Sequence, residues 1–247
     1  MIKYVINLDA DTKRLEDTKV VFSSANLTFE RIPAVAVSDM TPEEKKKAAS
    51  PFLFYLANSR RVRQAEIACG LSHIKCWKTA FADGAVVAAV FEDDVCFDAE
   101  LLNVHLDEIE KTNDPNIPTV WLLQKGLPKG KHNDCMWYEL TSTKDVGHSW
   151  CTICYVINAS AAERITKILT PMSNVIDAWS TFARCGIRVL VASKPCATNR
   201  AVVSTIKRST RRLWKYSLFR KFYWFRYHLS FWFDILFLKA RFRKALK

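Results

Sequence analysis

The chain has 247 residues, 49% of them hydrophobic and 25% charged, which is enough for a sizeable core and excludes a disordered protein. The net charge of +12 would suit a nucleic-acid-binding protein, but residues 207–247 carry 13 Lys and Arg against a single acid, Asp234. Residues 1–206 are therefore neutral overall, and we expect one body at 1–206 followed by a basic segment at 207–247.

The chain opens with a predicted β-α unit. Residues 2–8 alternate with strand-forming residues, and residues 9–12 are a helix-start signal that a helical pattern follows. The loop that joins strand and helix could hold a nucleotide, so Asn7, Leu8 and Arg14 are candidate nucleotide contacts. A plain structural turn explains the loop equally well.

Residues 64–82 predict a helix with two distinct faces. Its apolar stripe consists of Ile67, Leu71, Ile74 and Phe81. The neighbouring face carries, nearly in line, Glu66, Gly70, His73 and Trp77. An acid, an imidazole and an indole on one line indicate the wall of a site, and the glycine permits close approach by a ligand or another backbone. The alternative is a purely structural histidine, which is the commoner role of a lone His on a helix.

Residues 86–95 form an uninterrupted apolar run that ends in the acids Glu92, Asp93 and Asp94. Such a run predicts a central strand of an α/β sheet, and its end is where open α/β sheets hold ligands. Along an extended chain Glu92 and Asp94 would lie on the same side, about 6–7 Å apart, with Asp93 opposite. This arrangement suits Mg²⁺ or Mn²⁺ bound with substrate phosphates. Alternatively, the acids cap a helix that begins near Asp98.

The remaining pattern alternates strands with helices, which favours one α/β domain. Strands are predicted at residues 28–32, 34–37, 119–123, 152–158 and 187–192. Helices are predicted from Thr41 and at residues 99–112, 159–169 and 174–184. The loop-like stretch at residues 125–144, with a possible hairpin at 135–141, is a candidate substrate lid.

Residues 207–247 contain 13 of the 30 aromatic residues, interleaved with basic ones. The longest stretch without Lys or Arg is the 12 residues 227–238, too short for a bilayer span of about 20 residues. Aromatic residues combined with Lys and Arg are typical of helices that lie in the headgroup region of an anionic membrane. Stacking on nucleic-acid bases is the competing interpretation. The apolar content of 231–238 favours the membrane, and no nucleic acid is expected.

The cysteines and the N-terminus suggest a cytosolic, reducing environment. Only Cys151 and Cys154 have CxxC spacing, and no second pair or suitably spaced histidines complete a zinc site. We expect reduced, mostly buried thiols. Residues 1–8 lack the apolar core and cleavage site of a signal peptide, so the cytosol is the default expectation.

Four segments, in order, resemble glycosyltransferase family 25, the bacterial lipooligosaccharide galactosyltransferases. They are residues 4–8 with Arg14, residues 65–73 with Trp77 and Lys78, residues 91–95, and residues 155–158 with Ala161 and Ala162. The resemblance covers roughly residues 2–200 and leaves the tail outside. Ala65 stands where the family often has Gly, and residues 173–177 are looser than the proline–acid pair that is common there.

The resemblance implies a GT-A-like, Rossmann-related single domain with a mixed sheet. It also implies a UDP-sugar donor, with UDP-galactose the first choice, a Mn²⁺ or Mg²⁺ ion held by the DxD-like acids, and transfer with inversion to a β-linkage. The acceptor would be a lipooligosaccharide or lipopolysaccharide core. In this scheme Asp94 binds the metal, Glu92 and Asp93 contact metal or ribose, and His73 lines the donor site.

The chemistry of such a transfer defines two tasks. A sugar diphosphate leaves with negative charge on its phosphates, which a carboxylate-bound cation neutralises. Inversion needs a carboxylate that deprotonates the acceptor hydroxyl. Asp177, on the predicted helix 174–184, is the first candidate for this base and Glu66 the second. Alternatively, Asp177 is an acid that the helix dipole favours at a helix start.

Basic side chains could contact the phosphates or the acceptor, although most surface bases are simply solvated. The candidates are Arg60, Arg61, Arg63 and Lys125, and His148 could line the donor site.

Together these features predict a peripheral enzyme on the cytoplasmic face of the bacterial inner membrane, attached through residues 207–247. One rival is a metal-dependent phosphoryl-transfer enzyme, but the six scattered glycines supply no phosphate loop. The other is a non-catalytic membrane- or nucleic-acid-binding module, which would leave the acidic strand without a purpose.

Overall fold

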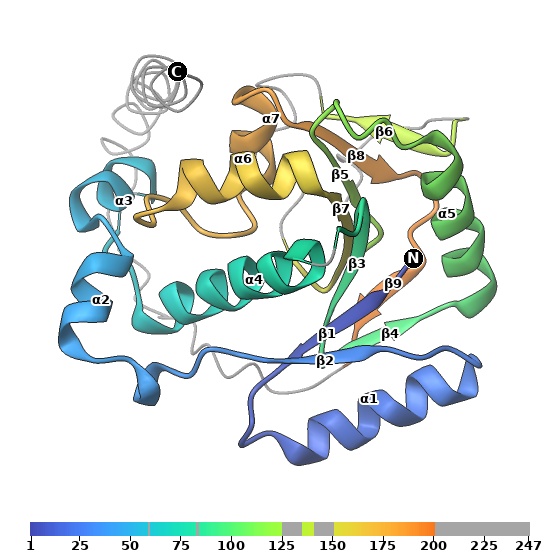
Figure 1. The fold of residues 1–247 in the computed structure, drawn as a ribbon, viewed down its shortest axis with the longest axis horizontal. Helices are drawn as coiled ribbons and strands as arrows, with labels where there is room; N and C mark the ends of the chain where they lie inside the picture. Colours follow the sequence, from blue (N-terminus) through green and yellow to red (C-terminus); the bar gives the residue numbers. More distant parts are fainter. Residues whose placement is uncertain (59, 83, 125–134, 141–150, 201–247) are drawn as a thin grey trace, which may run out of the picture.

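The computed structural model describes residues 1–58, 60–82, 84–124, 135–140 and 151–200, which form a mixed α/β fold (Figure 1). The main sheet has seven strands in the order β2-β1-β3-β7-β5-β8-β6. These strands are β1 Lys3–Asn7, β2 Glu30–Pro33, β3 Val87–Glu92, β5 Thr119–Leu122, β6 Trp137–Glu139, β7 Cys154–Asn158 and β8 Arg188–Ala192. A second, two-stranded sheet pairs β4 Val95–Phe97 with β9 Ala197–Asn199.

The main sheet is mixed, as predicted. β1 pairs in parallel with both β2 and β3, whereas β7 runs antiparallel to β3 and β5. β8 is parallel to β5, and β6 is an antiparallel edge strand on β8. Because β1 and β3 are parallel neighbours, with Ile6 opposite Glu92, their carboxyl ends meet at one edge of the sheet.

Helices cover both faces of this sheet (Figure 1). They are α1 Thr12–Ser24, α2 Pro42–Ala48, α3 Pro51–Asn58, α4 Gln64–Ala82, α5 Ala99–Thr112, α6 Ala159–Leu169 and α7 Trp179–Arg184, with a short 3-10 helix at Val37–Asp39. On one face Trp77 of α4, Ile165 of α6 and Phe182 of α7 share a core with alternate strand residues. On the other, Phe22 of α1 and Leu102 of α5 belong to a second core. The sheet is therefore buried on both sides, as its apolar strands require.

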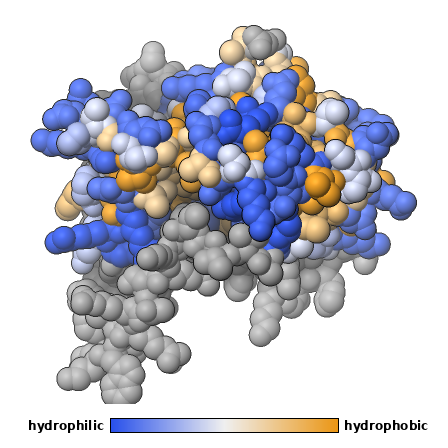
Figure 2. Space-filling view, turned by 90° about the horizontal axis from the view of Figure 1, so that it is seen from below, coloured by the Kyte–Doolittle hydropathy of each residue, from blue (hydrophilic) through white to orange (hydrophobic). Residues whose placement is uncertain are grey.

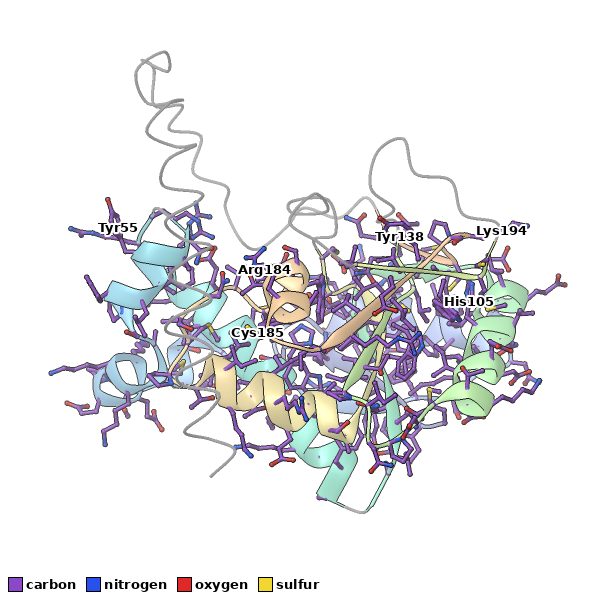
Figure 3. The ribbon with its side chains drawn as sticks, turned by 90° about the horizontal axis from the view of Figure 1, so that it is seen from above. Tyr55, His105, Tyr138, Arg184, Cys185 and Lys194 are labelled. Carbon is purple, nitrogen blue, oxygen red and sulfur yellow. The ribbon has the colours of Figure 1, made fainter. Side chains whose placement is uncertain are left out.

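One outer face of the molecule is mainly polar. The face on which α1 lies is covered mainly by hydrophilic side chains, with apolar ones in scattered groups (Figure 2). Tyr55 of α3 and His105 of α5 lie at opposite ends of the molecule (Figure 3). Within the described ranges, every helix is too short or too polar to cross a bilayer.

Most predicted elements are confirmed, and local chemistry explains their ends. Helices 64–82, 99–112 and 159–169 match α4, α5 and α6. Asp98 caps α5 by accepting a hydrogen bond from the Leu101 amide, so the acids of the preceding strand do not cap this helix. Thr41 and Glu44 form a capping box at the start of α2.

Three predictions of secondary structure were wrong. Residues 34–37 leave the sheet after Pro33, and the Val35 amide donates to the Ser72 hydroxyl instead of a strand. Residues 135–140, the described part of the hairpin predicted at 135–141, contain the single strand β6, which pairs with the distant β8 instead of with a neighbouring hairpin strand. The helix predicted at 174–184 begins only at Trp179, because residues before it form turns, with the Ala178 amide bonded to the Val175 carbonyl.

The close approach expected at Gly70 is made by a side chain. A Cβ atom there would lie 2.1 Å from Cε of the buried Met172. The glycine therefore serves the packing of α4.

Phe22→Ala is expected to lower the free energy of unfolding by about 3–5 kcal/mol, because Phe22 is fully buried and its ring packs edge-on against Phe29, Phe91 and Phe97. Val20→Ala on the same helix is the matched control, since Val20 is 68% exposed and should change stability by about 0.5 kcal/mol or less. Urea unfolding measures both, and similar losses in the two variants would contradict the assignment of this core.

Candidate active site

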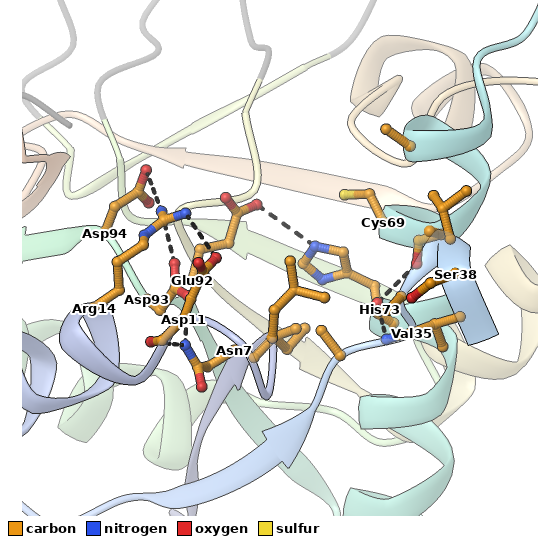
Figure 4. A pocket seen from close by; sticks show the side chains of 18 residues that line it. Asn7, Asp11, Arg14, Val35, Ser38, Cys69, His73, Glu92, Asp93 and Asp94 are labelled. Atoms are coloured by element: carbon orange, nitrogen blue, oxygen red, sulfur yellow. Dashed lines mark hydrogen bonds and ion pairs between the residues drawn. The ribbon is translucent and has the colours of Figure 1, made fainter. Parts of the chain in front are cut away.

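A cavity of about 470 Å³ opens where β1 and β3 end (Figure 4). Its walls come from these two strand ends, the start of α1, the segment 34–38 and one face of α4. The predicted site residues that line it are Asn7, Leu8, Arg14, His73, Glu92, Asp93 and Asp94. The structure thus brings together residues that are up to 87 positions apart in the sequence.

The acids lie at the sheet edge, as predicted, but their predicted geometry was wrong. β3 ends at Glu92, and Asp93 and Asp94 form a turn into β4, so Glu92 and Asp94 are not on one side of an extended strand. Contacts from other elements hold the turn. The Thr18 hydroxyl donates to the Asp93 carbonyl at 2.7 Å, and the Arg200 amide donates to the Asp94 carbonyl at 2.7 Å.

Arg14 clamps the two turn carboxylates. Its Nη2 lies 2.7 Å from Asp93 Oδ1 and 3.0 Å from Asp94 Oδ2. Asn7 Nδ2 donates to the other Asp93 oxygen at 2.7 Å. The predicted nucleotide loop therefore first serves to neutralise and orient the acids, and Asp93 has partners on both oxygens.

Asp94 is different, because its Oδ1 atom is buried and has no hydrogen-bond partner within the described part of the chain. The pKa of Asp94 is raised to about 6, because burial and the charge of Glu92 both raise it and Arg14 only partly offsets them. An orphaned carboxylate oxygen beside other carboxylates fits a bound cation, which would supply the missing partner. The donor set at this end of the cavity thus fits Mn²⁺ or Mg²⁺.

Glu92 is held by α4 and by the segment just before β7. Its Oε1 accepts a hydrogen bond from the Thr152 hydroxyl and lies 3.6 Å from Nε2 of the buried His73. Burial alone would raise the pKa of Glu92, but hydrogen bonds from His73 and Thr152, with the charges of His73 and Arg14, outweigh it and lower the pKa. Glu92 is therefore held as a carboxylate at the cavity wall.

His73 is fixed in turn by its other ring nitrogen. Nδ1 is 2.8 Å from the Tyr155 hydroxyl, which also accepts a 2.8 Å hydrogen bond from Trp77 Nε1. All three side chains are buried. His73 and Trp77 of α4 are thus joined through the Tyr155 hydroxyl, and His73 Nε2 lies 3.6 Å from the Glu92 carboxylate.

The two candidate bases lie outside the cavity lining. Asp177 precedes α7 in a turn, where Oδ2 accepts a hydrogen bond from the Cys151 amide at 3.1 Å. Burial raises its pKa, and the Glu92 charge adds to this effect. Glu66 forms a two-pronged ion pair with Arg60, at 2.8 and 2.6 Å, and accepts from the Arg63 amide.

Of the basic residues predicted to contact phosphates or acceptor, those that the structure describes lie outside the cavity lining. Arg60 is paired with Glu66, and Arg61 is exposed away from the cavity lining. Lys125 and His148 lie outside the described residues. All eight cysteines are free, as expected, but only four of them are buried.

The sequence analysis missed Thr152, Arg200 and Cys69. Cys69 lies one turn before His73 on α4, so the helical spacing could have placed it in the site. Thr152 and Arg200 reach the acids only through sheet pairing, and no local signal indicates their contacts.

Asp94→Asn is expected to stabilise the metal-free protein at pH 7 by about 1–3 kcal/mol, because a pKa raised on folding makes the ionised carboxylate less favourable in the folded than in the unfolded chain. The gain should be absent below the ordinary pKa of 3.8 and develop as the pH rises to about 6. Urea unfolding in chelator across this range measures it. An equal difference at both ends of the range would contradict this origin.

A family model and several known proteins resemble parts of this chain. The model of glycosyltransferase family 25 (LPS biosynthesis protein) matches residues 1–179. A Haemophilus influenzae protein, provisionally named a glycosyltransferase, is 32% identical over 94 residues, which cover 37% of this chain and 32% of that protein. The lacto-N-neotetraose biosynthesis glycosyltransferase LgtE of Neisseria meningitidis serogroup B is 31% identical over 95 residues, 38% of this chain and 32% of that protein. The match thus spans about a third of these curated relatives.

Among solved structures, a glycosyltransferase involved in the glycosylation of the major capsid of PBCV-1 is 14% identical, with a TM-score of 0.41. The likeness covers 83% of this chain and 95% of that one.

Proposed function

The chain belongs to glycosyltransferase family 25, and we propose that it transfers a hexose from a nucleotide-sugar donor to a lipooligosaccharide or lipopolysaccharide core acceptor. The observation that carries the proposal is the cavity at the ends of β1 and β3, where Asp94 leaves a buried carboxylate oxygen without a partner. Ligands of α/β sheets bind at the carboxyl ends of the strands, where this cavity lies. A carboxylate oxygen there can bind the metal ion that assists the departure of a sugar diphosphate.

Finer features of the proposal rest on the resemblance to the family. They are UDP-galactose as the donor, inversion to a β-linkage, and a GT-A-like organisation of the mixed sheet. The cavity supports a nucleotide sugar in size, since about 470 Å³ lies within the range of small-molecule sites.

We assign the cation, Mn²⁺ or Mg²⁺, to Asp94, with Glu92 as the second predicted ligand. When bound, it would offset the negative charge that develops on the leaving diphosphate. Arg14 keeps Asp93 and Asp94 together and adds positive charge at the same end of the cavity. Asn7 fixes Asp93, and His73 with Thr152 fixes Glu92, so each acid has one set orientation.

Asp177 remains the proposed base. Its raised pKa suits proton abstraction from a sugar hydroxyl, and its pKa responds to the charges of Glu92 and His73, which line the cavity. Glu66, the second candidate, is occupied by Arg60 and the Arg63 amide.

The donor and the metal are tested together by measuring transfer and hydrolysis of UDP-galactose, UDP-glucose and UDP-N-acetylhexosamines with Mn²⁺, Mg²⁺ or chelator. We expect UDP-galactose turnover that chelator removes and that Asp94→Asn lowers by at least about a hundredfold. Asp98→Asn is the matched control, because Asn also caps a helix and Asp98 lies outside the cavity lining. Full activity of Asp94→Asn would refute the proposed metal site.

Asp177→Asn is expected to keep donor binding but to lower transfer by about 10²–10⁴-fold, because the acceptor hydroxyl would lose its proton acceptor. Glu66→Gln should mainly change stability, since it weakens the pair with Arg60. Calorimetric binding of UDP and initial transfer rates separate these effects. Near wild-type turnover would remove Asp177 from the mechanism.

We also propose peripheral attachment to the cytoplasmic face of the bacterial inner membrane. Residues 207–247 lie outside the described residues, so their aromatic and basic composition is the support. The full chain should float with anionic liposomes and much less with neutral ones, whereas a chain that ends at residue 206 should stay unbound. Failure of the full chain to bind anionic vesicles, or binding to RNA instead, would count against this role.

A further inference from the structure

A second cluster of metal-ligand side chains lies at the other end of the cavity. Figure 4 shows Cys69 and His73 of α4 beside Glu92, with Arg14 and Asp94 on the far side of Glu92. One possible ligand atom from each of Cys69, His73 and Glu92 lies within 4.8 Å of the other two. Cys69 and His73 are one helical turn apart, the spacing that places two ligands on the same helix face.

The ligand types distinguish this cluster from the acids. A thiolate, an imidazole and a carboxylate suit a borderline-soft ion such as Zn²⁺, whereas Mg²⁺ and Mn²⁺ favour oxygen ligands throughout. His73 Nε2 and Glu92 Oε1 lie 3.6 Å apart. Ligand atoms around a tetrahedral Zn²⁺ are about 3.3–3.8 Å apart, given bonds of about 2.0–2.3 Å. The separation of His73 Nε2 and Glu92 Oε1 is therefore close to that of two ligands of one Zn²⁺ ion.

The surroundings also hold the ligands in place. The Tyr155 hydroxyl, which Trp77 fixes, lies 2.8 Å from His73 Nδ1 and can accept its proton. With the Nδ1 proton held there, Nε2 can give up the proton that faces Glu92 and offer its lone pair to a metal ion. The Thr152 hydroxyl donates a hydrogen bond to the same Glu92 oxygen, Oε1, that faces His73. Hydrogen bonds of this kind, to groups behind the ligands, are typical of metal sites in proteins.

We propose that Cys69, His73 and Glu92 bind a Zn²⁺ ion, distinct from the cation assigned to Asp94. All three residues line the cavity, so the fourth coordination position faces its interior and accepts water or a ligand hydroxyl. Burial keeps the metal-free Cys69 as a thiol, and its proton is released to solvent when the thiolate coordinates the metal. The site stands whether or not the chain transfers galactose.

Cobalt is the probe, because tetrahedral Co²⁺ bound to a thiolate gives two signals. It absorbs visible light, and it has a thiolate-to-metal charge-transfer band in the near ultraviolet. We expect the full chain to bind one Co²⁺ with both signals and Zn²⁺ to displace it. Cys69→Ser should remove the thiolate band and weaken Zn²⁺ binding by at least about tenfold, the loss typical of changing even an outer partner. Cys96→Ser, at an exposed cysteine of β4, should retain both signals.

Two further variants keep the result interpretable. Cys69→Ala provides a second thiol-free chain, and circular dichroism checks that either variant is folded. Asp94→Asn should lose Mn²⁺-dependent transfer and keep the cobalt–thiolate band, so failure of the proposed function and failure of this site are separate outcomes. A folded wild-type chain without a thiolate band, or a band that persists in Cys69→Ser, would overturn the proposal.

Discussion

Repulsion among three consecutive carboxylates is the constraint around which the site is built. Glu92, Asp93 and Asp94 meet at one sheet edge, partly out of water, where like charges interact more strongly than in solvent. Arg14 supplies the opposing charge for two of them. His73 and Thr152 stabilise the charged form of the third. Helices α1 and α4 and the approach to β7 are therefore tied to this edge by electrostatics as well as by packing.

The contacts divide the cavity into two chemically distinct ends. At one end, oxygen atoms and a guanidinium surround Asp94, whose Oδ1 is left without a hydrogen-bond partner in the described chain. At the other, sulfur and imidazole nitrogen from α4 join Glu92. Glu92 stands between the two ends (Figure 4), so its orientation decides which of them it serves. The 3.6 Å contact between Glu92 Oε1 and His73 Nε2 favours the α4 end.

Much of the fold could be predicted from local patterns. The apolar run before Glu92 predicts a doubly covered strand and the apolar stripe of 64–82 predicts a helix, and both are confirmed. Of the neighbouring helix face that was expected to line a site, only His73 lines the cavity. The turn at Asp93 could not be predicted, because it depends on Thr18 and Arg200, which are distant in sequence. The turn at Asp177, which was predicted to be helical, could not be predicted for the same reason. Its carboxylate accepts a hydrogen bond from the Cys151 amide, and helix propensity does not predict such a long-range contact.

Arg14 also affects how the chain can be produced in a cell. Small metal-dependent domains often stay unfolded until their ion arrives, since nothing else holds their ligands together. Here a permanent side-chain cation already bridges Asp93 and Asp94. The proposed catalytic body can therefore fold without its cation, and a shortage of divalent ions would leave intact protein that lacks only the proposed metal.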